Sequence, residues 1–134
     1  MLGLQKFSVE IINHYLVGGL FCLEVIMFEI NGIAWDIKFV DILSPFLTRS
    51  DGSQSLAVCD GNKCTVYVSN RLKWSKLRKV LAHELCHCFC FSYGIHMPME
   101  QEEYLADWVS LYGADLVYLL DDLMASIGKN RGVA

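Results

Sequence analysis

The chain has 134 residues, of which 54% are hydrophobic and 19% are charged, and its formal net charge is −4. This length predicts one domain, and the apolar content excludes a wholly disordered chain. The negative net charge argues against general nucleic-acid binding, which uses a basic surface. Of the six cysteines, Cys86, Cys88 and Cys90 fall within one predicted helix, where they cannot pair with one another. We therefore expect reduced thiols and a cytoplasmic location.

The first 26 residues are predicted to form an apolar segment that packs on, or precedes, the core. Several apolar positions have the spacing of one face of a short helix: Phe7, Ile11, Ile12, Tyr15 and Leu16. The run from 16 to 30 is strongly apolar, which would suit a membrane segment. However, Glu24 and Glu29 interrupt it, and it lacks a basic flank. We therefore expect no membrane insertion, and favour a core helix that leads into a buried strand.

A hairpin is predicted next. Asn31-Gly32 is the dipeptide that favours a tight turn, and it separates strand-like runs at about residues 20–30 and 33–40. The segment from 41 to 53 contains turn-forming residues and is expected to be a loop.

A second hairpin is predicted between about residues 56–59 and 65–69, through a turn at 60–63. Cys59 and Cys64 flank this turn and could face each other across it. Because an edge strand can pair with an extended peptide backbone, we expect this hairpin to supply such an edge.

The following helix is predicted from about residue 76 to 92. Ser75 is a suitable N-cap, and Gly94 is a suitable C-cap with Pro98 beyond it. Apolar residues at helical spacing would form its buried face: Leu77, Val80, Leu81, Leu85, Cys88 and Phe89.

This helix contains the motif His83-Glu84-Leu85-Cys86-His87, an H-E-x-x-H pattern. Residues four apart lie on one face of a helix, so both imidazoles can reach one ion. Glu84 lies about 100° around the helix from His83, where its carboxylate could take a proton from a water on that ion. The pattern is typical of zinc peptidases, with Zn²⁺ as the cofactor.

A second helix is predicted from about residue 98 to 125, with a bend at Gly113. Pro98 can begin it, and acidic residues in its first turn suit the helix dipole. Its apolar face would contain eight residues: Leu105, Trp108, Val109, Tyr112, Leu116, Leu119, Leu120 and Leu123.

A catalytic zinc site needs a third protein ligand, and this second helix offers several carboxylates. We expect Glu103 to bind the metal and Asp107, four residues later, to hold the far nitrogen of a ligating histidine. Glu100 and Glu102 are expected to lie at the surface and complement the dipole. Glu102 and Asp107 remain alternative ligands.

The sequence resembles the ImmA/IrrE family of metallopeptidases, which are gluzincins. The residues that carry the resemblance are Leu81-Ala82-His83-Glu84-Leu85-Cys86-His87 and Glu103-Tyr104-Leu105-Ala106-Asp107, which match H-E-x-x-H followed by E-x-x-A-[D/N]. The resemblance implies an α+β fold with a small antiparallel sheet packed on zincin helices. It implies a metallopeptidase domain over residues 27–128, and residues 129–134 would be a loose tail. In that family, Glu103 falls on the third-ligand position.

The resemblance also implies an activity. Zinc held by His83, His87 and Glu103 would activate water, with Glu84 as general base, for site-specific cleavage of a protein such as a transcriptional repressor. A donor for the carbonyl oxygen would be needed, and four residues are candidates: Tyr93, His96, Tyr104 and Tyr112.

Two other functions fit the same residues. The chain could be a non-catalytic module on a metalloprotease core, such as a phage-encoded modulator of a host protein. It could also hold a structural zinc, with Cys90 as the fourth ligand, but Glu84 would then have no role.

Overall fold

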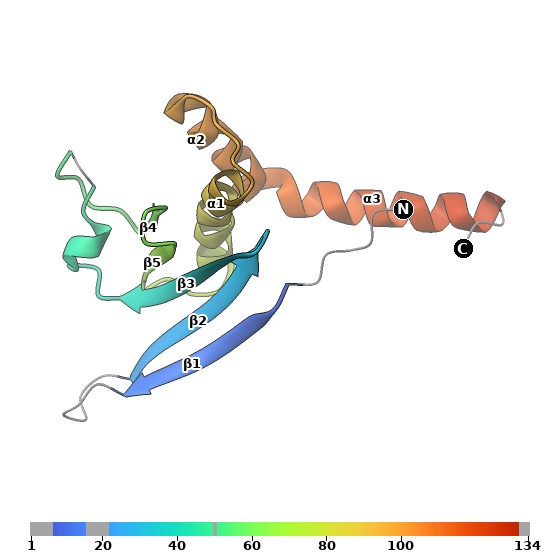
Figure 1. Ribbon diagram of the computed structural model, residues 1–134. Coiled ribbons are helices and arrows are strands. Elements are labelled where there is room, and N and C mark those ends of the chain that lie inside the picture. Colours follow the sequence, from blue (N-terminus) through green and yellow to red (C-terminus); the bar gives the residue numbers. More distant parts are fainter. Residues whose placement is uncertain (1–6, 16–21, 50, 132–134) are drawn as a thin grey trace.

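The computed structural model describes residues 7–15, 22–49 and 51–131. Strands and helices are both present, so the predicted α+β class is confirmed (Figure 1). The strands are β1 (Val9–Tyr15), β2 (Cys22–Ile30), β3 (Ile33–Val40), β4 (Ala57–Asp60) and β5 (Thr65–Ser69). The helical elements are η1 (Pro45–Leu47), α1 (Trp74–Ser92), α2 (Met99–Trp108), the π-helical segment η2 (Val109–Gly113) and α3 (Ala114–Arg131).

The five strands form one sheet in the order β1-β2-β3-β5-β4. Three of the pairings are antiparallel, but β3 and β5 run parallel, so the sheet is mixed and the predicted antiparallel sheet was wrong at this one pairing. Both predicted hairpins are present. Asn31 and Gly32 have φ of 50° and 77°, the left-handed conformations that a two-residue hairpin turn requires. As predicted, the second hairpin supplies an edge, because β4 ends the sheet.

The prediction of a helix near the N-terminus was wrong, because residues 9–15 form strand β1 instead. Val9 and Ile11 favour extended backbone, and β1 pairs along its whole length with β2, from Val9 opposite Phe28 to Tyr15 opposite Cys22. The competing helical spacing was overridden by this pairing. Leu16, the last residue of the expected helical face, lies in the segment 16–21, outside the described residues.

The core lies between the sheet and α1. Strand β5 is buried at all five positions, since it has a strand on each side and α1 against the sheet. Trp35 from β3 is fully buried, and Cys88 from α1 packs in the same cluster. Most of the predicted apolar face of α1 packs against it, and Phe89 is the exception at 36% exposed.

A buried hydrogen bond joins the sheet to the end of α1. The Trp35 indole Nε1 donates to Ser92 Oγ at 2.8 Å, and both residues are buried.

Replacing Ser92 by Ala leaves the indole N–H without this acceptor, so we expect roughly 1–3 kcal/mol of destabilisation. Ser75→Ala is the matched control, because Ser75 is exposed and Lys73, not Ser75, occupies the N-cap. Urea unfolding of both variants tests this, and equal stabilities would contradict it.

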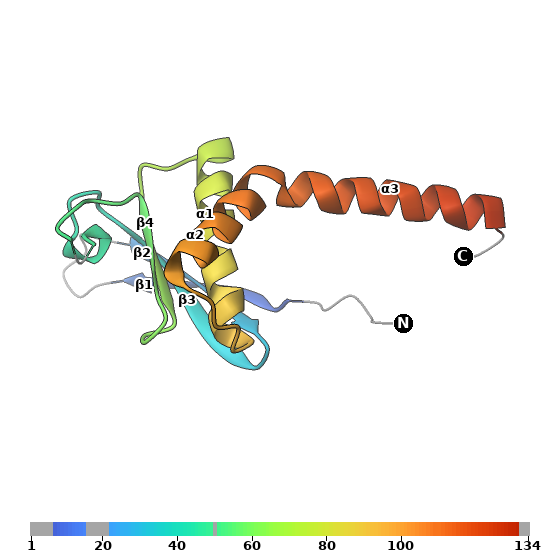
Figure 2. The same ribbon diagram turned by 90° about the horizontal axis from the view of Figure 1, so that it is seen from above.

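The long second helix is present, but its burial was predicted wrongly. It is continuous through η2, whose last residue is Gly113, and reaches Arg131, beyond the predicted end. Leu116, Leu119, Leu120 and Leu123, which were expected on a buried face, are 50–58% exposed. The reason is that α3 extends away from the rest of the protein (Figure 2). Among the described residues, no helix combines the length and the apolar character needed to cross a membrane.

Candidate metal centre

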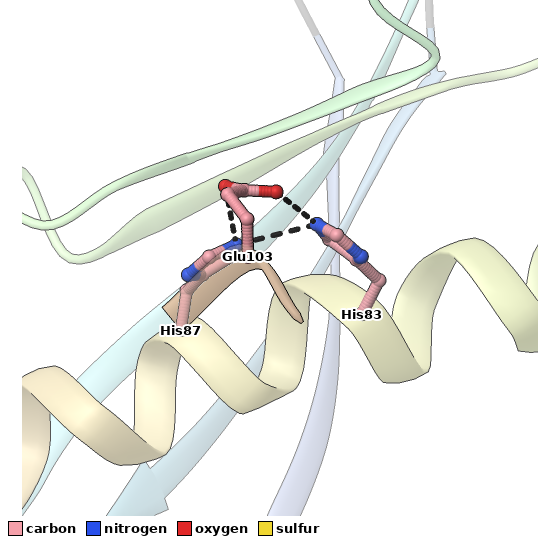
Figure 3. Close-up of side chains that lie close together, drawn as sticks. All are labelled: His83, His87 and Glu103. Atoms are coloured by element: carbon pink, nitrogen blue, oxygen red, sulfur yellow. Dashed lines mark hydrogen bonds and ion pairs between the residues drawn. The ribbon is translucent and has the colours of Figure 1, made fainter. Parts of the chain in front are cut away.

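Three side chains converge between α1 and α2 (Figure 3). His83 and His87 project from successive turns of α1, and their Nε2 atoms lie 3.3 Å apart. Glu103 from α2 reaches both: its Oε2 is 3.1 Å from His83 Nε2, and its Oε1 is 3.1 Å from His87 Nε2. The structure thus brings together the three residues that the sequence indicated as ligands.

The far side of each imidazole is held by a second carboxylate. His83 Nδ1 lies 2.9 Å from Asp107 Oδ1, and His87 Nδ1 lies 2.7 Å from Glu102 Oε2. A carboxylate accepts hydrogen bonds, so a neutral ring that donates from Nδ1 to this carboxylate has a lone pair at Nε2. In that tautomer both lone pairs are directed at the space that Glu103 borders.

This arrangement fits a cation. The two ring nitrogens lie 3.3 Å apart, and each lies 3.1 Å from one Glu103 oxygen; lone pairs at these distances repel one another when no proton or cation lies between them. A tetrahedral zinc ion with bonds of about 2.0–2.2 Å would hold its ligand atoms roughly 3.3–3.6 Å apart, close to the observed spacing. His83, His87 and Glu103 could therefore hold a metal ion, and this donor set suits zinc.

Glu102 is the site residue that sequence reasoning placed wrongly. It was expected at the surface, but its side chain is only 17% exposed and contacts His87. A signal was available: two histidine ligands need two acceptors for their Nδ1 groups, and Asp107 can serve only one of them. Glu100, the other residue expected at the surface, is exposed.

The contact between Glu102 and His87 gives a matched test within one helix turn. Glu102→Ala removes the acceptor that fixes the His87 ring, so we expect zinc affinity to fall by roughly ten- to a hundredfold. Glu100→Ala removes the same charge from the same helix end without touching a ligand, and should leave the affinity within about twofold. Competition titration with a chelating dye measures both, and equal losses would show a general charge effect instead.

Glu84 lies beside the ligand residues and is buried, with only 7% of the residue exposed. Burial raises the pKa of its carboxyl above the ordinary value, while His83 and His87 oppose this and Glu103 adds to it. A carboxylate whose pKa is raised is a stronger base at neutral pH.

A cleft of about 890 Å³ opens over these residues. His83, Glu84, His87 and Glu103 line one side of it, and residues 57–59 of the edge strand β4 line another. Glu103 is the most exposed ligand, with 46% of its side chain accessible, so the ligand group faces the cleft. An extended chain in this cleft would pass between the ligands and the edge of the sheet.

Other residues considered from the sequence are placed differently. Of the four candidate donors, His96 lines the cleft, whereas Tyr93, Tyr104 and Tyr112 are exposed side chains outside its lining. Arg49, which no sequence pattern indicated, lines the cleft and lowers the pKa of Glu84 slightly against the effect of burial.

The cysteines take structural positions. Cys86 and Cys90 pack with Ala106 of α2, and burial raises the pKa of the Cys90 thiol. In the part of the chain that the structure describes, the metal-binding group contains no cysteine, so a site with Cys90 as a ligand is not formed. Cys59 and Cys64 are free thiols, and Cys59 Sγ lies 3.8 Å from Cys88 Sγ.

Comparisons of the chain with protein-family models, with curated proteins and with solved structures found no match. The fold and site therefore define a class, an α+β protein with a candidate metal centre of two histidines and a glutamate, and its function is inferred from the site.

Proposed function

We propose that this protein is a zinc metalloendopeptidase. The observation that carries the proposal is the convergence of two imidazole nitrogens and a carboxylate at 3.1–3.3 Å, beside a buried glutamate, on the wall of a cleft. A purely structural site would have no need for Glu84 or for an open cleft. The resemblance to the ImmA/IrrE family supports the same activity.

The roles of the residues follow from their positions. A bound zinc ion would polarise the peptide carbonyl and lower the pKa of the attacking water. His83, His87 and Glu103 would hold the ion, while Asp107 and Glu102 keep the two rings oriented. Glu84 would accept a proton from the attacking water and deliver it to the departing amide nitrogen.

The substrate is proposed to be an extended segment of a protein, such as a transcriptional repressor. Support comes from β4, whose outer edge has no partner strand in the described sheet and whose residues line the cleft. Such an edge offers backbone donors and acceptors to an extended chain. Cleavage at a flexible segment is expected to be selective, because one side of the cleft is a fixed strand.

The activity is tested with the zinc-loaded protein and a library of unstructured peptides analysed by mass spectrometry. Cleavage after a small set of sequences, absent in Glu84→Gln, is the expected result. Cleavage of every peptide would contradict the selectivity. Cleavage of none, with zinc bound at His83, His87 and Glu103, would contradict the proposed activity.

A further inference from the structure

One face of α3 is apolar and open to solvent. Six side chains form a stripe along it, each between 44% and 58% exposed: Leu116, Leu119, Leu120, Leu123, Met124 and Ile127. We call these six residues the α3 stripe. Asp115 and Asp122 are turned by more than about 100° around the helix from its centre, so charge lies on the opposite side.

The stripe is uncovered because α3 leaves the body of the protein at its first turns (Figures 1 and 2). Near this base, Arg78 of α1 donates a hydrogen bond to the Tyr118 hydroxyl at 3.4 Å. Most helical stability comes from the packing of an apolar face, and an isolated helix of this length is marginal in water. Apolar patches of several hundred Å² on a soluble protein generally mark an interaction surface.

The spacing within the stripe identifies the partner. Leu116, Leu120, Leu123 and Ile127 follow one another at intervals of four, three and four residues, which is the seam of a left-handed helix pair. The order of these intervals, four-three-four, is the same when the helix is followed from either end. A second copy of α3 in the antiparallel direction therefore places Leu116 against the partner's Ile127, and Leu120 against the partner's Leu123. Self-complementarity of this kind is the property of a twofold interface.

Size and shape agree with this arrangement. With six side chains each about half exposed, one stripe presents roughly 600 Å², so two copies would bury roughly 1,200 Å², the lower end of the range for specific interfaces. In an antiparallel pair the two bodies lie at opposite ends of the helices. In a parallel pair both bodies would lie at the same end and collide.

We propose that the protein forms a homodimer through antiparallel pairing of α3 along the α3 stripe. The proposal depends neither on the metal nor on peptidase activity, because α3 lies outside the candidate metal centre.

Sedimentation equilibrium of the full chain tests the proposal. The wild type is expected to dimerise at roughly 10 µM or above. Leu123→Glu places a charge in the seam and should raise the dissociation constant by roughly a hundredfold or more. Ala125→Glu adds the same charge on the far face of α3 and should change it by less than about threefold. A wild type that stays monomeric at several times these concentrations, or equal effects of the two variants, would overturn the proposal.

Direction is tested by mixing Leu120→Glu with Leu123→Lys. Each variant alone is expected to be monomeric. In an antiparallel pair the glutamate of one chain faces the lysine of the other, so the mixture should recover a one-to-one heterodimer. Circular dichroism confirms that both variants are folded. Folded variants that remain monomeric when mixed would overturn the antiparallel arrangement.

Discussion

Glu84→Gln is expected to reduce the rate of peptide cleavage by roughly 10²- to 10⁴-fold, the usual contribution of a positioned general base. The amide cannot accept a proton from water, but it has nearly the shape of the carboxyl that it replaces. Glu84 is not one of the three ligand residues, so zinc affinity should stay within about tenfold. Initial rates on the best peptide, with metal content measured on the same samples, give both values.

This variant also separates the peptidase from the binding module considered from the sequence. A module that only holds a partner would keep its function in Glu84→Gln, whereas a peptidase would keep substrate binding and lose cleavage. Unchanged cleavage in a zinc-loaded Glu84→Gln sample would remove Glu84 from the mechanism.

The same substitution should raise the stability of the metal-free protein. Burial raises the pKa of Glu84 above 4.5, so the folded state binds this proton more tightly than the unfolded state does. The stability gained from the proton is present below pH 4.5 and is lost as the pH rises through the folded-state pKa. Metal-free Glu84→Gln should therefore be more stable than wild type at pH 7, with a difference that shrinks toward pH 4.5. Urea unfolding at the two pH values measures it, and equal stability at pH 7 would contradict the prediction.

Zinc is expected to stabilise the folded protein strongly. Binding to the folded state alone contributes about 4 kcal/mol when free metal exceeds the dissociation constant a thousandfold, and for a chain of this size that raises Tm by roughly 10–20 °C. The physical reason is the repulsion among His83, His87 and Glu103, which a cation replaces with three bonds. Calorimetry with zinc and after dialysis against a chelator measures the shift.

Two controls limit the interpretation of that shift. Magnesium prefers oxygen ligands and should stabilise the protein far less than zinc does. Glu103→Ala should lose most of the zinc effect while remaining folded, because its side chain is 46% exposed and is not part of the core. Equal stabilisation by zinc in this variant would place the metal elsewhere.

Sequence reasoning was most successful where the geometry is local. His83 and His87 share a helix, so the period of the helix alone brings their rings together. Asn31-Gly32 determines its hairpin in the same way, because only a few residues favour that turn. The position of Glu103 depended on the packing of α2 against α1, and its prediction drew on the family resemblance as well as on spacing.

The errors concern packing partners that a pattern does not specify. Residues 9–15 have apolar residues at helical spacing, but pairing with β2 makes them a strand. The spacing of apolar residues in α3 correctly predicted a helix with one apolar face. This spacing does not say whether that face packs against the same chain or against another one. Glu102 differs from Glu100 only by its angle to α1, which depends on how the two helices pack.

The most direct test of the metal centre is the metal content of the purified protein beside Glu103→Ala, measured by mass spectrometry after loading with zinc and removal of the excess. The site described above predicts about one zinc ion per wild-type chain and a large loss in the variant, since two histidines alone bind weakly. Full occupancy in both proteins would contradict the assignment of Glu103, and absence of zinc from the wild type would contradict the metal centre itself.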